Sequence, residues 1–123
     1  NIPIWLSLIS KDKHNLLDAS PFEMVFELLK PFSIDHLLIN CNTMDLTIDM
    51  CDQIHSAWSQ RWGVYPNLGK TNYENDYLNI ISDSNLNDGM ISLLSKEPNV
   101  IGLCCGSTPF HIKYLKSLIK STR

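Results

Sequence analysis

The sequence predicts an α/β protein of four βα units with parallel strands. Four short apolar runs lie along the chain, and each is followed by a segment with helical periodicity. The runs are apolar on both sides of the strand pleat, as in parallel sheets that helices cover. Two architectures fit this pattern, an open doubly wound sheet or part of a (βα)₈ barrel, and periodicity does not choose between them.

The first unit is predicted to begin with a strand over residues 2–9. Ser20 is expected to cap the helix that follows, with Pro21 at its first helical position, where a missing N–H costs nothing. Apolar residues then recur at helical spacing until Pro31 ends the helix.

The second unit combines a strand over residues 34–41 with a helix that Thr43 is expected to cap. The helix has an apolar stripe at helical spacing. This stripe includes Met44, Ile48, Cys51 and Trp58.

The third unit begins with a short strand over residues 63–65, which Pro66 ends. A polar stretch over 70–88 follows, rich in Asn, Asp and Ser. It is long for a plain connector, and such segments are often functional or partly helical. A short helix is predicted over 90–95.

The fourth unit begins with a strand over residues 99–103. Thr108 and Pro109 then open a last helix. Its apolar face is predicted to contain Ile112, Leu115, Leu118 and Ile119. Its solvated face is predicted to contain Lys113, Lys116 and Lys120.

Composition narrows the classes of protein to consider. The 123 residues are expected to form a single domain, and 44% of them are hydrophobic, enough for a core. The net charge of −3 offers no basic patch for nucleic acid. No apolar run approaches the roughly 18 residues of a membrane span. The first residues of the sequence lack the charged n-region of a signal peptide. A cytoplasmic location is therefore expected.

Three of the four cysteines lie at the ends of predicted strands. Cys41 ends the second strand, and Cys104 and Cys105 end the fourth. Active sites of parallel α/β folds lie at these carboxyl ends, so the three thiols are expected on one rim. Three thiolates suit Zn²⁺ with its fourth position open, where a substrate thiol could bind as thiolate. Methyl or alkyl transfer to sulfur is the reaction class that this predicts.

Other interpretations of the cysteines and histidines stay open. Cysteines are often small buried hydrophobes, as expected for Cys51 on its helix stripe. A thiol redox protein is a weaker interpretation, because no Cys-x-x-Cys spacing occurs. The histidines show no metal-binding spacing with one another and are expected in surface or core roles. They are His14, His36, His55 and His111.

Three ordered motifs resemble the homocysteine S-methyltransferase family. Its Gly-Gly-Cys-Cys-Gly-Thr/Ser-Thr-Pro run is matched by Gly-Leu-Cys-Cys-Gly-Ser-Thr-Pro at 102–109. Its Asn-Cys pair is matched at 40–41, and its Tyr-Pro-Asn-x-Gly motif at 65–69. The opening Pro-Ile-Trp-Leu-Ser at 3–7 also resembles the family's fifth strand.

The resemblance implies that residues 1–123 form the C-terminal half-barrel of a homocysteine-binding domain, with strands five to eight of a (βα)₈ barrel. It implies a cytoplasmic enzyme of methionine biosynthesis, with Zn²⁺ held by Cys41, Cys104 and Cys105. Asn67 matches a residue of the zinc and homocysteine pocket. The activity implied is transfer of a methyl group from a small-molecule donor to the homocysteine thiolate, which gives methionine. No catalytic residue is expected beyond the zinc ligands.

The sequence also departs from the family pattern. Leu103, Leu38 and Ala19 stand where glycines are usual, and the family's first four βα units have no counterpart here. A homodimer or a complementary N-terminal half-barrel would complete the barrel. A second hypothesis is therefore a catalytically degenerate zinc-binding half-barrel that acts as an interaction or regulatory module.

Overall fold

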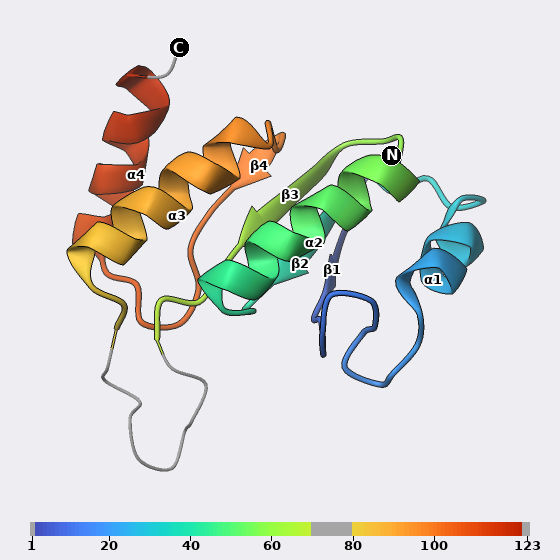
Figure 1. The fold of residues 1–123 in the computed structure, drawn as a ribbon. Coiled ribbons are helices and arrows are strands. Elements are labelled where there is room, and N and C mark those ends of the chain that lie inside the picture. Colours follow the sequence, from blue (N-terminus) through green and yellow to red (C-terminus); the bar gives the residue numbers. More distant parts are fainter. Residues whose placement is uncertain (1, 70–79, 122–123) are drawn as a thin grey trace.

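Strands and helices alternate along the whole described chain (Figure 1). The computed structural model describes residues 2–69 and 80–121. The strands are β1 (Trp5–Leu8), β2 (His36–Asn40), β3 (Trp62–Tyr65) and β4 (Val100–Ile101). The helices are α1 (Phe22–Leu29), α2 (Met44–Ala57), α3 (Asp83–Ser95) and α4 (Pro109–Ser121).

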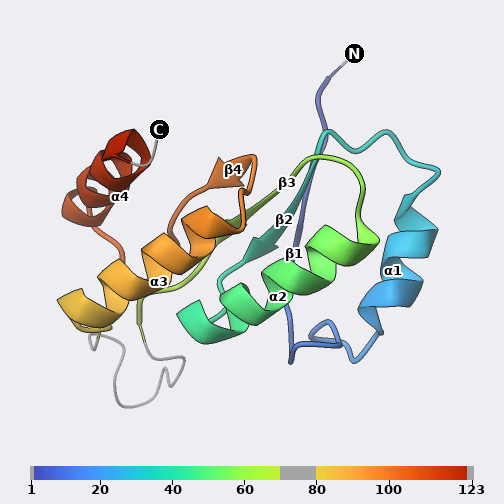
Figure 2. The same cartoon turned by 45° about the horizontal axis from the view of Figure 1, so that its top comes forward.

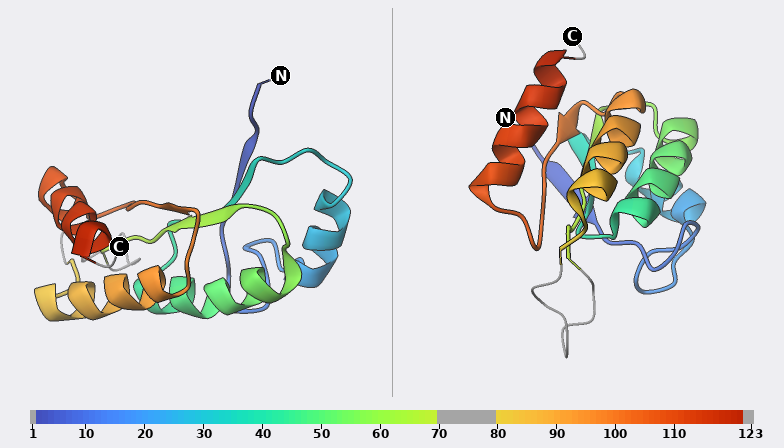
Figure 3. Two further views of the ribbon diagram at one scale, coloured as in Figure 1. Left: turned by 90° about the horizontal axis from the view of Figure 1, so that it is seen from above. Right: turned by 60° about the vertical axis from the view of Figure 1, so that its left-hand side comes forward.

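The four strands form one parallel sheet in the order β1-β2-β3-β4. Each strand lies beside its neighbour in the sequence, as in a barrel, whereas a doubly wound sheet reverses its order at a switch point. Seen from above, α2 and α3 lie on one side of the strands, and no described helix covers the other side (Figure 3). The predicted fold class is confirmed, and the arrangement is that of a barrel segment.

The core lies between the sheet and its helices. Leu37, Ile39 and Val64 are fully buried against this helix side. Helices α2 and α3 run side by side over it (Figure 2). Strand β1 is less buried than the central strands. Leu6 and Leu8 pack against the core, and the alternate residues are exposed. The helix-free face is therefore the concave face of a half-barrel.

The first two helices follow the sequence prediction closely. In α1 the cap is one residue later than predicted: Pro21 is the N-cap, with no side-chain capping bond, and the helix starts at Phe22. In α2 the Thr43 hydroxyl accepts from the Leu46 N–H at 3.4 Å, as the capping prediction requires.

Helix α3 begins at Asp83, seven residues before the predicted start. Ser82 is its N-cap, and the Ser82 hydroxyl accepts from the Asn85 N–H at 3.4 Å. The polar residues that suggested a connector thus supply the cap and first turns of a helix. The remainder of the polar stretch, residues 70–79, lies outside the described residues.

The buried face of α4 differs from the prediction by one position. Leu115 is buried, and Leu118 and Ile119 pack against the core, but Ile112 is 46% exposed. His111 is buried in its place, because it lies four residues before Leu115 and so shares its face. The three lysines are exposed as predicted. No helix among the described residues has the length and apolarity to cross a membrane.

Candidate metal centre

Cys41 follows β2 directly, and its backbone turns sharply there. Its φ of 55° is left-handed, which costs a residue with a Cβ about 1–2 kcal/mol. The Cys41 N–H donates to the Tyr65 carbonyl at 3.0 Å. The Cys41 carbonyl accepts from the Asn67 side-chain amide at 2.9 Å. The end of β3 therefore fixes the position at which β2 presents its thiol.

Cys104 and Cys105 lie in the tight turn between β4 and α4. The Cys104 N–H donates to the Pro66 carbonyl at 2.8 Å, and the Leu68 N–H donates to the Cys105 carbonyl at 2.7 Å. Ser107 closes the turn, since its N–H and its hydroxyl donate to the Cys104 carbonyl at 3.2 and 2.6 Å. The same segment after β3 thus anchors all three cysteines.

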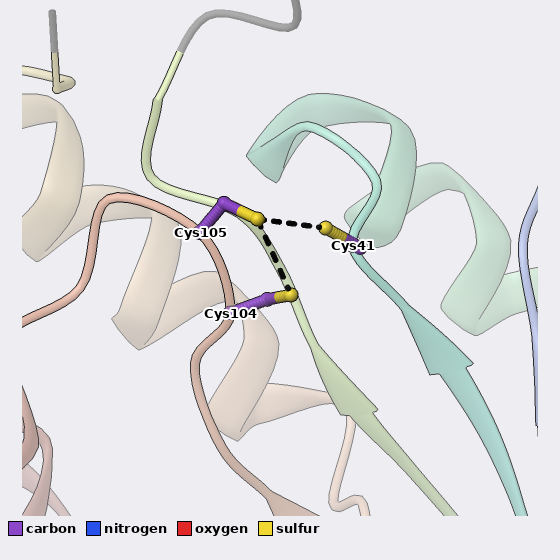
Figure 4. Close-up of side chains that lie close together, drawn as sticks. All are labelled: Cys41, Cys104 and Cys105. Atoms are coloured by element: carbon purple, nitrogen blue, oxygen red, sulfur yellow. Dashed lines mark hydrogen bonds between the residues drawn. The ribbon is translucent and has the colours of Figure 1, made fainter. Parts of the chain in front are cut away.

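The three thiols meet at the carboxyl rim of the sheet (Figure 4). Cys105 Sγ lies 3.4 Å from Cys41 Sγ and 3.9 Å from Cys104 Sγ. All three sulfurs lie within 4.8 Å of one another, and the side chains are half-buried. Thiolates that share one tetrahedral zinc at about 2.3 Å lie roughly 3.8 Å apart. The spacing and the donor chemistry therefore fit a zinc ion with one open position.

The surroundings of Cys41 favour the protonated form of its thiol when no metal is bound. Burial raises the pKa of the Cys41 thiol above its ordinary 9.0, and the hydrogen bond with Cys104 raises it further, while bonds with Cys105 oppose the shift. A metal must displace the thiol proton to bind. Metal affinity is therefore expected to increase with pH.

Asn67 lies beside Cys41, and only some of its polar groups have hydrogen-bond partners. The residue is only 3% exposed. Its backbone N–H donates to the Asn42 carbonyl at 2.8 Å, and its side-chain N–H donates to the Cys41 carbonyl. Its side-chain oxygen is buried and accepts no hydrogen bond from the described residues. Such an atom costs about 1–3 kcal/mol unless a ligand satisfies it. The substrate-binding role assigned to Asn67 remains a prediction that this unpaired oxygen motivates.

The other candidate residues lie apart from the thiol trio. Cys51 is fully buried in α2, as predicted, and its thiol donates to the Thr47 carbonyl at 3.2 Å. Within 2–69 and 80–121, the three cysteines are the one group that could hold a metal ion, so no histidine joins it. Sequence reasoning did miss the cap that His111 makes with Thr108, although their spacing is that of a capping box.

Fold and site together define a class of protein: a parallel α/β half-barrel with three converging thiols at the carboxyl rim of its strands. Comparison with known proteins then identifies the family. The family model for homocysteine S-methyltransferase matches residues 1–119. The chain belongs to the homocysteine S-methyltransferase family, which confirms the resemblance seen in its motifs.

Solved structures of a bacterial relative share the fold over most of the chain. They are crystal structures of the homocysteine methyltransferase MmuM from Escherichia coli. The metallated form matches with a TM-score of 0.74 at 26% identity, the apo form with 0.73 at 26%, and the oxidized form with 0.74 at 25%.

Each of these matches covers 94% of this chain but only part of the solved one. The covered share is 35% of the metallated, 39% of the apo and 36% of the oxidized chain. The chain thus spans little more than a third of these relatives. No curated protein matches it.

Proposed function

We propose that this chain supplies the zinc centre for transfer of a methyl group to the thiolate of homocysteine, which gives methionine. The observation that carries the proposal is the convergence of three thiols within 4.8 Å in a member of this family. In the reaction, a bond forms between the homocysteine sulfur and the methyl carbon. The bond between that carbon and the donor breaks, and the donor leaves with the electron pair.

Cys41, Cys104 and Cys105 would hold the ion as thiolates. Bound zinc would keep the homocysteine sulfur deprotonated at neutral pH, where a free thiol with a pKa near 8.5 is mostly protonated. The half-buried rim leaves the thiols accessible to a small substrate. We propose that the unpaired side-chain oxygen of Asn67 accepts a hydrogen bond from the bound substrate, while the Asn67 side-chain N–H donates to the Cys41 carbonyl and holds that peptide in place.

The reaction needs a second set of βα units. The helix-free face is open, and apolar side chains are exposed at both ends of the sheet. On the β1 side they include Ile4, Trp5 and Leu28, and on the α4 side Phe110 and Ile112. We propose that a complementary half-barrel covers them, either an N-terminal half or a second copy of the chain. We propose that the protein acts in methionine biosynthesis in the cytoplasm, where reducing conditions keep thiols available for a metal.

A second candidate function is a catalytically degenerate half-barrel that binds zinc and acts as an interaction or regulatory module. Leu38 favours it, because this leucine is buried outside the helix-side core, three residues before Cys41. A methyl-transfer assay with the chain and a complementary N-terminal half separates the two. Robust methionine formation would exclude the degenerate module.

Zinc content per chain tests the site itself. We expect the wild-type chain, purified with zinc and gel-filtered, to carry about one zinc, and Cys105→Ala to lose most of it. Cys105 is chosen because its sulfur lies within 3.4 Å of Cys41 Sγ and 3.9 Å of Cys104 Sγ. Cys51→Ala is the matched control, since Cys51 is buried in α2. Equal zinc contents in Cys105→Ala and wild type would refute the assignment.

A further inference from the structure

His111 lies in the first turn of α4. It is 7% exposed, and its Nδ1 accepts from the Thr108 N–H at 2.9 Å and lies 3.0 Å from the Thr108 hydroxyl. Because Nδ1 accepts a hydrogen bond from a backbone N–H, it carries no proton there. The ring therefore holds the start of α4 as an acceptor at Nδ1.

This contact is one half of a capping box. Thr108 precedes the first helical residue, and its carbonyl accepts from the Ile112 N–H at 3.3 Å. In a capping box the side chain of the third helical residue returns to the N-cap N–H, as His111 does here. Its planar ring also packs edge-on against Phe110, with centroids 5.7 Å apart. The start of α4 is thus held by a buried, rigid side chain.

The capped residue, Thr108, is also the last residue of the turn that carries two of the thiols. Two residues, Gly106 and Ser107, separate Thr108 from Cys105. Ser107 donates twice to the Cys104 carbonyl. Gly106 has a φ of 78° and no side chain to restrain it. The orientation of the turn therefore depends on its hydrogen bonds at one end and on the His111 cap at the other.

We propose that His111 is a positioning residue of the metal centre. It holds the 104–108 turn so that both thiols face Cys41, without being a ligand itself. The inference rests on the proposed zinc centre. Outer-shell partners of metal ligands typically change metal affinity by about 10–100-fold. Because His111 acts through the backbone, we expect the lower end, about tenfold.

Three variants of the full chain test this role. His111→Leu keeps the buried volume and removes the acceptor. His111→Asn keeps an acceptor, since the Asn oxygen can occupy the place of Nδ1. Leu115→Ala is the matched control, because Leu115 is buried on the same face one turn later and makes no cap. Its effect reports loss of stability alone.

Each chain is titrated with Co²⁺ at a temperature where circular dichroism shows all of them folded, and the thiolate-to-cobalt absorption is followed. His111→Leu should bind about tenfold more weakly, with an altered band, and His111→Asn should recover most of the affinity. Leu115→Ala should melt earlier yet bind Co²⁺ like wild type. Unchanged affinity in His111→Leu, or equal losses in His111→Leu and Leu115→Ala, would overturn the proposal.

A second readout needs no metal. Mass spectrometry measures the alkylation rates of Cys104 and Cys105 relative to Cys41 in the metal-free chain, and His111→Leu should raise both ratios. If wild type takes up no Co²⁺, the zinc proposal fails. The alkylation ratios then decide the positioning role separately: unchanged ratios would overturn it, and raised ratios would support it.

Discussion

Cys51 makes the stability of this protein sensitive to alkaline pH. Its side chain is fully buried in α2, and this burial raises the pKa of the thiol from 9.0 to about 12. Its proton also makes the hydrogen bond to the Thr47 carbonyl, which a thiolate could not donate. Between these two pKa values, the unfolded chain ionises this thiol and the folded chain does not.

The sign and the size of the effect follow from this difference. A group whose folded pKa is raised contributes stability below its unfolded pKa, and that stability is lost as pH rises toward the folded pKa. Cys51 should therefore have no effect at pH 7.5. At pH 10, one unit above the unfolded value, it should lower the free energy of unfolding by about 1.4 kcal/mol. This is a large share of a total of about 5–15 kcal/mol.

Urea unfolding measures this contribution of Cys51 to the free energy of unfolding. Wild type and Cys51→Ala are compared at pH 7.5 and pH 10, under reducing conditions. Cys51→Ala also leaves a cavity, but that cost is nearly the same at both pH values and cancels in the comparison. The other three cysteines are present in both chains. Wild type should therefore lose about 1.4 kcal/mol more than Cys51→Ala between the two pH values. Equal losses in both chains would refute the reasoning.

Two further predictions concern left-handed backbone positions. Ala19 has a φ of 68°, so Ala19→Gly should relieve strain and stabilise the fold by about 0.5–1 kcal/mol in urea unfolding; an unchanged midpoint would contradict this. Gly106 has a φ of 78°, and an added Cβ would lie 2.9 Å from the Gly69 nitrogen. Gly106→Ala should therefore lower the free energy of unfolding by at least about 1 kcal/mol and weaken metal uptake. Gly102→Ala is its control, because the Cβ would meet Tyr65 at 3.4 Å, and equal effects of both changes would count against the argument.

The sequence was sufficient to predict the βα units and the meeting of the thiols. Parallel strands end at the same rim, so residues that follow β2 and β4 had to lie near one another. Two features decided between an open sheet and a barrel segment, namely the sequential strand order and the absence of described helices on one face (Figure 3). Hydrophobic periodicity cannot show this, because it records that a strand is apolar and not which element covers it.

Other features depended on local chemistry that apolar patterns do not record. Helix α3 starts with a Ser82 cap in a polar stretch, and its first turns offer few apolar residues to a periodicity search. The exposure of Ile112 and the burial of His111 follow from where α4 starts and from a polar contact with Thr108. The left-handed backbone of Cys41 is imposed by hydrogen bonds from a different strand end. Local capping bonds decided the first two of these outcomes, and tertiary contacts decided the third.

The two leucines beside the site differ in their consequences. Leu103 packs against the core on the helix side, so its replacement of a glycine does not fill the space in front of the thiols. Leu38 lies on the other face, where it is paired in register with Gly63. A Cβ at Gly63 would clash with the Val100 carbonyl oxygen and come within 2.9 Å of the Leu38 side chain, so the glycine leaves room for both neighbours. Gly63 thus makes room for Leu38 on this face, and Leu38 alone is a weak argument for a degenerate site. The case for or against activity therefore depends mainly on the βα units that complete the barrel.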